Sequence, residues 1–282
     1  FVRRQRTLTD PMLDLALFRT GSFNSIVATH SLSMFMLAGI QFLTAQHLQL
    51  VLDLSPIRAG MWMVPAAIGG IAGSLLASVL LRMMRPVNVI VSNLLVGALG
   101  FGILTQVEVS SGLSVLIVGL IVATFAVSLV TALTTDMIIA AVPSERAGTA
   151  SGVSETSAEL GIAMGIAVLG SIGTVIYRNQ LRDALPEAVV SQINESLIDT
   201  LGGAVALSEQ LPEGLGVVLR ESARDAFTQG LAFNAIIGAV AMVGLAALCF
   251  WLLRPVSEQE GANRQSRPEA FDHASRGLAS DD

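Results

Sequence analysis

The sequence predicts an all-α integral membrane protein with six spanning helices. Hydrophobic residues make up 52% of the 282 residues and charged residues 13%, whereas a soluble domain has about 25% charged residues. The mean hydropathy is +0.68. Six stretches reach the ~20 mainly apolar residues needed to cross a hydrocarbon core of ~30 Å. Arginines gather at alternate ends of these stretches, as expected for a multi-pass protein.

The expected spans cover about 25–49, 59–81, 87–107, 113–135, 149–176 and 229–253. They define a transmembrane region over 23–254, preceded by a cytoplasmic linker over 1–22. The first and fifth spans are the least uniform, because they carry His30, Gln41 and two glutamates among their apolar residues. Neither contains a proline or a charge run that would end it.

The arginines set the expected orientation. Eleven lie on one side of the predicted spans and five on the other, and the chain has no lysine. The first group is Arg3, Arg4, Arg6, Arg19, Arg82, Arg85, Arg146, Arg254, Arg264, Arg267 and Arg276, and the second is Arg58, Arg178, Arg182, Arg220 and Arg224. The positive-inside rule therefore predicts a protein of the cell (plasma or inner) membrane with both termini in the cytoplasm. The net charge of −6 comes largely from an acidic outer loop and tail, so it does not indicate a nucleic-acid partner.

The connection between the fifth and sixth spans, residues 178–228, is the long one. Apolar residues recur in it at helical spacing on either side of Gly202 and Gly203. These residues are Val190, Ile193, Leu197 and Leu201, then Leu215, Val218, Leu219, Ala223 and Phe227. The pattern fits an outer hairpin of two short amphipathic helices, with a mobile acidic loop as the alternative. The tail 255–282 lacks apolar periodicity and is predicted to be disordered.

Several functional classes find no support in the sequence. Cys249 is the single cysteine, which excludes an internal disulfide and a cysteine metal site. HExxH, the Walker loop and GxGxxG are absent. The chain opens with Phe1 and has no signal peptide, and we interpret it as a fragment or a truncation product. We expect a protein that is not an enzyme and that holds no metal and no cofactor.

Two acids inside the fifth span are the leading candidates for function. The stretch "TASGVSETSAELGIAMGIAVLG" places Glu155 and Glu159 four residues apart, on one helical face and facing one cavity. Placing a carboxylate in hydrocarbon costs at least ~2.5–3.5 kcal/mol, and desolvation and repulsion both disfavour two charged neighbours. Such a pair can carry a proton or balance a lipophilic cation. Rise per residue puts Glu155 about 13 Å and Glu159 about 20 Å into the helix. The alternative is a pair neutralised by a neighbouring helix for structure alone.

Other polar residues within the spans are weaker candidates. His30, Ser33, Gln41 and Thr44 share a face of the first span, and Thr124, Ser128, Thr131 and Thr135 share a face of the fourth. They are candidates for lining a cavity, with interhelical hydrogen bonding as the alternative. Trp62 suits either a substrate surface or an interfacial aromatic belt. Asp136 and Arg146, at the cytoplasmic mouth, are candidates for a gate or interface.

Three runs together resemble a known family. They are "DPMLDLALFRTGSF" before the first span, "LDLSPIRAGMWMVPAAIGG" between the first two and "VPSERAGTASGVSETSAELGIAMGIAVLGS" entering the fifth. They are similar to the carboxy-terminal half of the fourteen-helix drug:proton antiporters of the major facilitator superfamily, and the resemblance covers about residues 1–255. It implies a half-transporter of two inverted three-helix units, with the amino-terminal half missing. The turn "LLRMMRPVNVI" departs from the superfamily's Gly- and Asp-containing loop, so we assign no latch to it.

The resemblance implies proton-coupled efflux of lipophilic cations, dyes or quaternary ammonium compounds across the bilayer, driven by a proton gradient. The run "SET…ELG" parallels the family's acidic motif, with Glu155 the closer match. Two alternatives stay open at this point. One is a self-standing six-helix membrane protein that acts as a homodimer or accessory subunit. The remote one is an intramembrane serine protease using "GTASG" at 148–152 and His30.

Overall fold

The computed structural model describes residues 21–109, 112–185 and 198–278, with side chains to Leu252. Its long helices are α2 (Gly21–Gln46), α3 (Pro56–Met83), α4 (Pro86–Leu104), α5 (Gly112–Ala140), α6 (Ala147–Ala184) and α9 (Glu213–Leu278). Shorter elements are the π-helix η2 (His47–Val51), the 3₁₀ turn η3 (Ser144–Arg146) and α8 (Leu201–Ser208). Most of the predicted linker 1–22, the tip of the loop near 108–112, and Val190, Ile193 and Leu197 lie outside the described residues.

Each long helix is long and apolar enough to cross a membrane. The candidate spans are Phe23–Val51, Pro56–Met83, Pro86–Leu104, Leu113–Ala140, Ser144–Ala184 and Gly214–Leu252. The described part of the chain contains no strand. The predicted fold class, an all-α membrane protein with six spanning helices, is confirmed.

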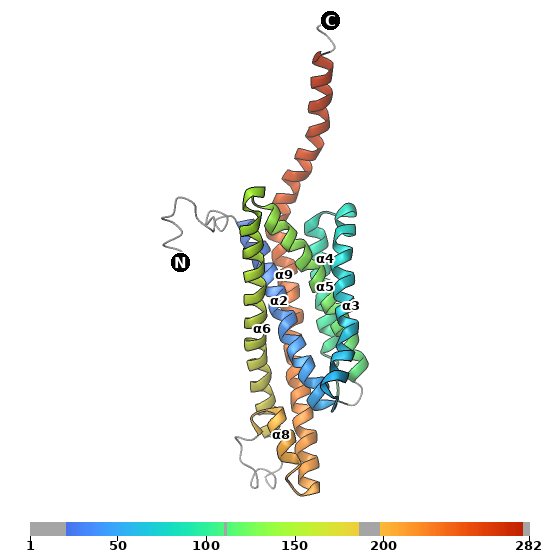
Figure 1. Ribbon diagram of the computed structural model, residues 1–282, viewed down its shortest axis with the longest axis vertical. Helices are drawn as coiled ribbons and strands as arrows, with labels where there is room; N and C mark the ends of the chain where they lie inside the picture. Colours follow the sequence, from blue (N-terminus) through green and yellow to red (C-terminus); the bar gives the residue numbers. More distant parts are fainter. Residues whose placement is uncertain (1–20, 110–111, 186–197, 279–282) are drawn as a thin grey trace, which may run out of the picture.

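Prolines set the starts of two helices. α3 begins with Pro56 directly after Ser55, whose hydroxyl accepts the backbone N–H of Arg58, and α4 begins with Pro86 directly after Arg85. Proline suits the first helical position because its missing N–H would have no partner there. The α2–α3 and α3–α4 connections are therefore short, and successive helices reverse direction (Figure 1).

The alternation places the helix ends in two groups (Figure 1). The start of α2, the α3–α4 turn and the junction of α5 with α6 lie at one end of the bundle. The α2–α3 turn and α8 lie at the other. Arg82, Arg85 and Arg146 thus share the first end, whereas Arg178 and Arg220 belong to the second.

The central helix contacts have an internal two-fold relation, although the contact between α6 and α9 has no equally extensive counterpart between α3 and α4. α2 packs on α6, α3 on α5, α4 on both α5 and α9, and α2 on α5. The relation pairs α2 with α5, α3 with α6, and α4 with α9. Under this exchange the α2–α6 contact becomes the α3–α5 contact, and the α2–α5 and α4–α9 contacts are unchanged. This is the arrangement of two inverted three-helix units, the architecture of a half-transporter.

Glycines make the two equivalent contacts close. A Cβ on Gly161 or Gly165 of α6 would overlap the backbone carbonyl of Ser31 or Phe35 in α2. In the related contact, a Cβ on Gly73 of α3 would overlap the carbonyl of Phe125 in α5, and one on Gly69 would press on that of Ile121. GxxxG pairs therefore bring backbones together twice, at related places. A third pair, Gly148 and Gly152, faces open space among the described residues.

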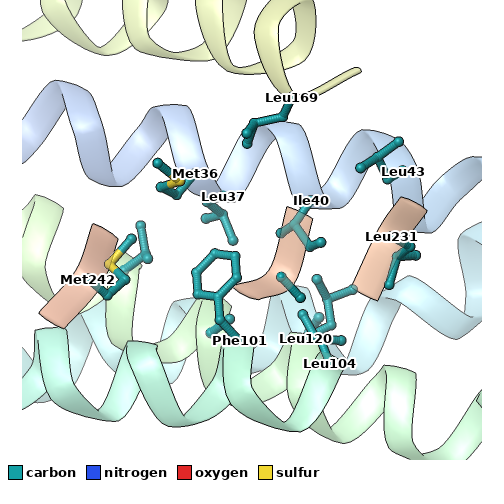
Figure 2. Close-up of a cluster of buried hydrophobic side chains, with 14 of the residues drawn as sticks. Met36, Leu37, Ile40, Leu43, Phe101, Leu104, Leu120, Leu169, Leu231 and Met242 are labelled. Atoms are coloured by element: carbon teal, nitrogen blue, oxygen red, sulfur yellow. The ribbon is translucent and has the colours of Figure 1, made fainter. Parts of the chain in front are cut away.

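The apolar core lies between α2, α4, α5 and α9 and reaches α6 (Figure 2). α2 contributes Met36, Leu37, Ile40 and Leu43. Phe101 and Leu104 of α4, Leu120 of α5, Leu169 of α6, and Leu231 and Met242 of α9 meet them there. This packing fixes α2 against α5 and α6.

At the other end of the bundle the structure differs from the predicted hairpin. α6 continues to Ala184 and α9 already starts at Glu213, so the second apolar stripe of the predicted loop forms the first turns of α9. Leu219 and Ala223 of that stripe are fully buried, and α8 packs against α9. Burial within the protein thus extends these helices beyond what hydropathy requires.

Ion pairs between described residues help to hold this end together. Arg178 bonds Asp199 and Arg220 bonds Glu209, each at 3.2 Å, and Arg224 bonds Asp53 of the α2–α3 turn. The last pair joins α9 to the connection between the first two spans.

At its other end α9 runs to Leu278, into the region 255–282 for which the sequence predicts disorder. The disorder of residues 255–282 in solution stays a prediction.

Candidate functional site: a polar cavity between four helices

A cavity of about 810 Å³ lies between α2, α3, α5 and α6. Its polar lining comes from all four helices: His30 and Gln41 from α2, Ser74 from α3, Thr124, Ser128, Thr131, Thr135 and Asp136 from α5, and Ser151, Ser154, Glu155 and Glu159 from α6. The cavity is large enough for a small organic molecule.

Three carboxylates give the cavity its charge. Glu155 and Glu159 come from α6 and Asp136 from the end of α5, and all three are exposed. Within the described residues, the lining contains no arginine, and the sequence has no lysine. A site of this composition attracts cations and protons and repels anions.

One face of α6 supplies its share of the lining. Ser151, Glu155 and Ile162 recur at helical spacing along this face, with Ser154, Ala158 and Glu159 beside them. Gly161 and Gly165 lie on a neighbouring face and press against α2. The glycine contact therefore fixes the rotation of α6 so that both glutamates look into the cavity.

Two side-chain hydrogen bonds connect the helices around the cavity. His30 Nδ1 of α2 lies 2.9 Å from Thr134 Oγ1 of α5, and Thr135 Oγ1 of α5 lies 3.2 Å from Ser154 Oγ of α6. His30 is 3% exposed. α5 is thus tied to both α2 and α6 at the level of the cavity.

The structure places the predicted site residues in two groups. Glu155, Glu159, His30, Gln41, Thr124, Ser128 and Asp136 line the cavity. Ser33 and Thr44 lie outside its lining, with fully buried hydroxyls that have no hydrogen-bond partner in the part of the chain that the structure describes. Trp62 is 44% exposed on α3 and Arg146 ends η3, so the structure brings neither into the lining.

From the sequence, Trp62 was the candidate in the second span, and the residues of α3 that line the cavity were missed. Gly70 and Ser74 of α3 line the cavity one turn apart. The signal that could have found them is the pair Gly69 and Gly73 on α3, which has the same four-residue spacing as Gly161 and Gly165 on α6.

The serine–histidine alternative has little geometric support. Ser151 and His30 both line the cavity, but the Ser151 hydroxyl donates to the Ala147 carbonyl and His30 bonds Thr134.

The chain matches the family model described as Major Facilitator Superfamily over residues 3–166. It is 34% identical over 248 residues to the multidrug efflux pump LfrA of Mycolicibacterium smegmatis, covering 88% of this chain and 49% of that protein. It is 30% identical over 262 residues to the methyl viologen resistance protein SmvA of Salmonella typhimurium, covering 89% and 50%. The chain thus spans about half the length of the curated relatives it matches.

A solved structure has the same fold. It is the crystal structure of a bacterial homologue of the human lysosomal transporter Spinster, in an inward-facing and unoccupied conformation. The TM-score is 0.57 at 17% identity, and the match covers 87% of this chain and 52% of that one.

Proposed function

Since this chain belongs to the major facilitator superfamily, we propose that it is the carboxy-terminal half of a proton-coupled multidrug exporter. The substrates are lipophilic cations, dyes or quaternary ammonium compounds. Relatives named for multidrug efflux and methyl viologen resistance support the substrate class. The proposal also places the protein in the cell membrane with both termini in the cytoplasm, supported by the excess of arginine at that end.

One observation carries the proposal: the open cavity holds Glu155, Glu159 and Asp136 and no arginine. In a membrane, carboxylates without a fixed partner are costly unless a proton or a mobile cation neutralises them. Glu155 and Glu159 are the proposed carriers of the proton and the counter-charge, and Gln41, Thr124 and Ser128 are proposed to line the substrate path. A cation that enters the site displaces a proton, which couples the two fluxes.

The exposed surface around the cavity is suited to contact with another protein unit. Trp62, Ile68 and Leu75 of α3 and Leu160 and Met164 of α6 are large apolar residues that remain exposed. Within a membrane, such apolar faces contact either lipid or another protein. The proposed neighbour is the amino-terminal half of the same polypeptide, because the match covers about half the length of the relatives. A second copy of this chain remains the other candidate, and the mass of the purified complex distinguishes the two.

Replacing the glutamates in the complete transporter tests the function. In inverted vesicles, ethidium transport and proton movement are followed together for Glu155→Gln, Glu159→Gln and the double variant. Loss of an opposite charge costs about 1.5–3 kcal/mol, so we expect transport to fall roughly ten- to hundred-fold. Thr44→Val, at a buried site outside the cavity, is the matched control. Wild-type coupling in both single variants and the double variant would contradict the proposal.

A further inference from the structure

We propose that His30 is a third proton-carrying residue of the cavity and that Thr134 is the positioning residue that keeps its Nε2 free to accept the proton. The inference rests on the proposed function, because it concerns how protons enter and leave the same site. It goes beyond the two glutamates by giving the proton a carrier on a different helix.

The hydrogen bonds around Thr134 determine which nitrogen of His30 holds the hydrogen. Thr134 Oγ1 lies 2.9 Å from the Val130 carbonyl and 3.1 Å from the Thr131 carbonyl. A threonine hydroxyl has one hydrogen, and within a helix it donates that hydrogen to a carbonyl of the preceding turn. The oxygen of Thr134 is then left as an acceptor for His30 Nδ1 at 2.9 Å. In neutral His30 the hydrogen therefore sits on Nδ1, and Nε2 carries a free lone pair.

The free Nε2 belongs to a side chain that lines the cavity. His30 is part of the lining, and among the described residues Nδ1 alone is hydrogen-bonded to a side chain. His47, on the same continuous segment, makes a useful contrast. Both of its ring nitrogens are buried without a hydrogen-bond partner among the described residues, and the residue is 0% exposed. His30 is therefore placed to exchange protons with the cavity, whereas His47 is sealed away from it.

Two of the helices around His30 bring charged groups to the cavity. α6 supplies Glu155 and Glu159, and α5 supplies Asp136. α3 contributes only uncharged residues to the lining. From α9, the thiol of Cys249 is hydrogen-bonded to the hydroxyl of Thr29, with 3.1 Å between Sγ and Oγ1.

The charge on His30 changes what the cavity binds. When Nε2 gains a proton from the water in the cavity, the net charge of the site rises by one, the imidazolium balances one carboxylate and the site attracts cations less. A proton passed to Nε2 by a neighbouring carboxyl leaves the net charge of the site unchanged. When a cation binds, Nε2 returns its proton to water and the imidazole is neutral again. The number of protons released per bound cation therefore includes a contribution from His30.

Chemical modification tests the accessibility of His30 directly. Diethyl pyrocarbonate acylates neutral imidazole, and mass spectrometry of peptides from the complete transporter reports each histidine separately. We expect His30 to react at least about ten-fold faster than His47, with a rate that rises with pH as the imidazole loses its proton. Equal rates at His30 and His47, or a rate at His30 that ignores pH, would overturn the proposal.

Variants of Thr134 separate positioning from folding. Thr134→Val keeps the shape and removes the acceptor for Nδ1, so the midpoint of the rate profile should move by about half a pH unit or more. Thr134→Ser restores the hydroxyl and should restore the midpoint. If both variants keep the wild-type midpoint, Thr134 does not position His30.

Proton release on addition of ethidium tests the role of His30. We expect His30→Gln to lower the protons released per ethidium bound, and Ser33→Ala, one turn away and outside the lining, to leave the number unchanged. Unchanged release in His30→Gln would overturn this inference and leave the proposed function standing. If wild-type protein releases no proton with ethidium, the proposed function fails, and the modification profile alone decides whether His30 exchanges protons with the cavity.

Discussion

At the scale of single residues, Asp53 shows how one side chain can serve both backbone and packing. It lies in the α2–α3 turn with a φ of 51°, the one non-glycine residue in the left-handed region among the described residues. Aspartate tolerates this region better than most residues. Its carboxylate pairs with Arg224, whose side chain is 17% exposed. Asp53 therefore fixes the turn and also neutralises a mostly buried cation of α9.

Two substitutions of Asp53 should separate these roles. Asp53→Asn keeps the tolerance for the left-handed backbone and removes the charge, which should cost about 1 kcal/mol. Asp53→Ala removes the charge and also the short polar side chain that tolerates positive φ, so it should lower the stability further than Asp53→Asn does. Thermal unfolding of the purified protein in detergent measures both. Equal melting temperatures for the two variants would argue against the backbone role.

The placement of residues could be predicted where it depends on local spacing alone. The separation of Glu155 and Glu159 by four residues predicts a shared face, and both line the cavity. The same argument was too coarse for α2. At about 100° per residue, Gln41 lies ~20° from His30 around the helix, whereas Ser33 lies ~60° away on the other side. That rotation turns Ser33 out of the lining. The hydrogen bond between His30 and Thr134 joins residues 104 positions apart, so no local sequence pattern predicts it.

At the scale of helices, glycines decide which pairs come into close contact. Gly161 and Gly165 meet the backbone of α2, and Gly69 and Gly73 meet that of α5. Gly152 has the same sequence spacing from Gly148 and meets nothing within 4 Å. The GxxxG pattern predicts where close approach is permitted, and the fold decides where it happens.

Alanine at two glycines of the same helix should test this distinction. Gly161→Ala places a methyl group against the Ser31 carbonyl, which cannot move without shifting α2, so we expect a loss of about 1–3 kcal/mol of stability. Gly152→Ala adds the methyl group in open space and should be neutral or slightly stabilising. Unfolding temperatures in detergent compare the two. A Gly161→Ala variant as stable as Gly152→Ala would contradict the packing described for α2 and α6.

Helix bounds were less predictable than helix number. Hydropathy marks the residues that suit lipid, and it gave six spans because that signal is strong. It carries no information on helices that continue into water, where α6 and α9 are held by buried apolar residues and by the Arg178–Asp199 and Arg220–Glu209 pairs. The apparent loop between them is accordingly shorter than the sequence suggested.

At the scale of the whole molecule, the two inverted units explain where the cavity lies. The related contacts α2–α6 and α3–α5 form two parallel helix pairs, and the cavity opens between them. The repeat could not be read from the sequence, because the two halves share small residues at contact points rather than a recognisable motif. Charge is the asymmetric feature: α6 carries Glu155 and Glu159, and α3 offers uncharged residues to the lining.

The central claim is that this cavity exchanges protons for cations, and proton release on cation binding tests it most directly. Purified complete transporter in weakly buffered detergent is mixed with ethidium, and a pH dye records the protons released per ethidium bound. The account predicts release from the wild-type protein and almost none from the Glu155→Gln, Glu159→Gln double variant, which should also bind ethidium at least about ten-fold more weakly. Release and affinity that match the wild type in the double variant would contradict it.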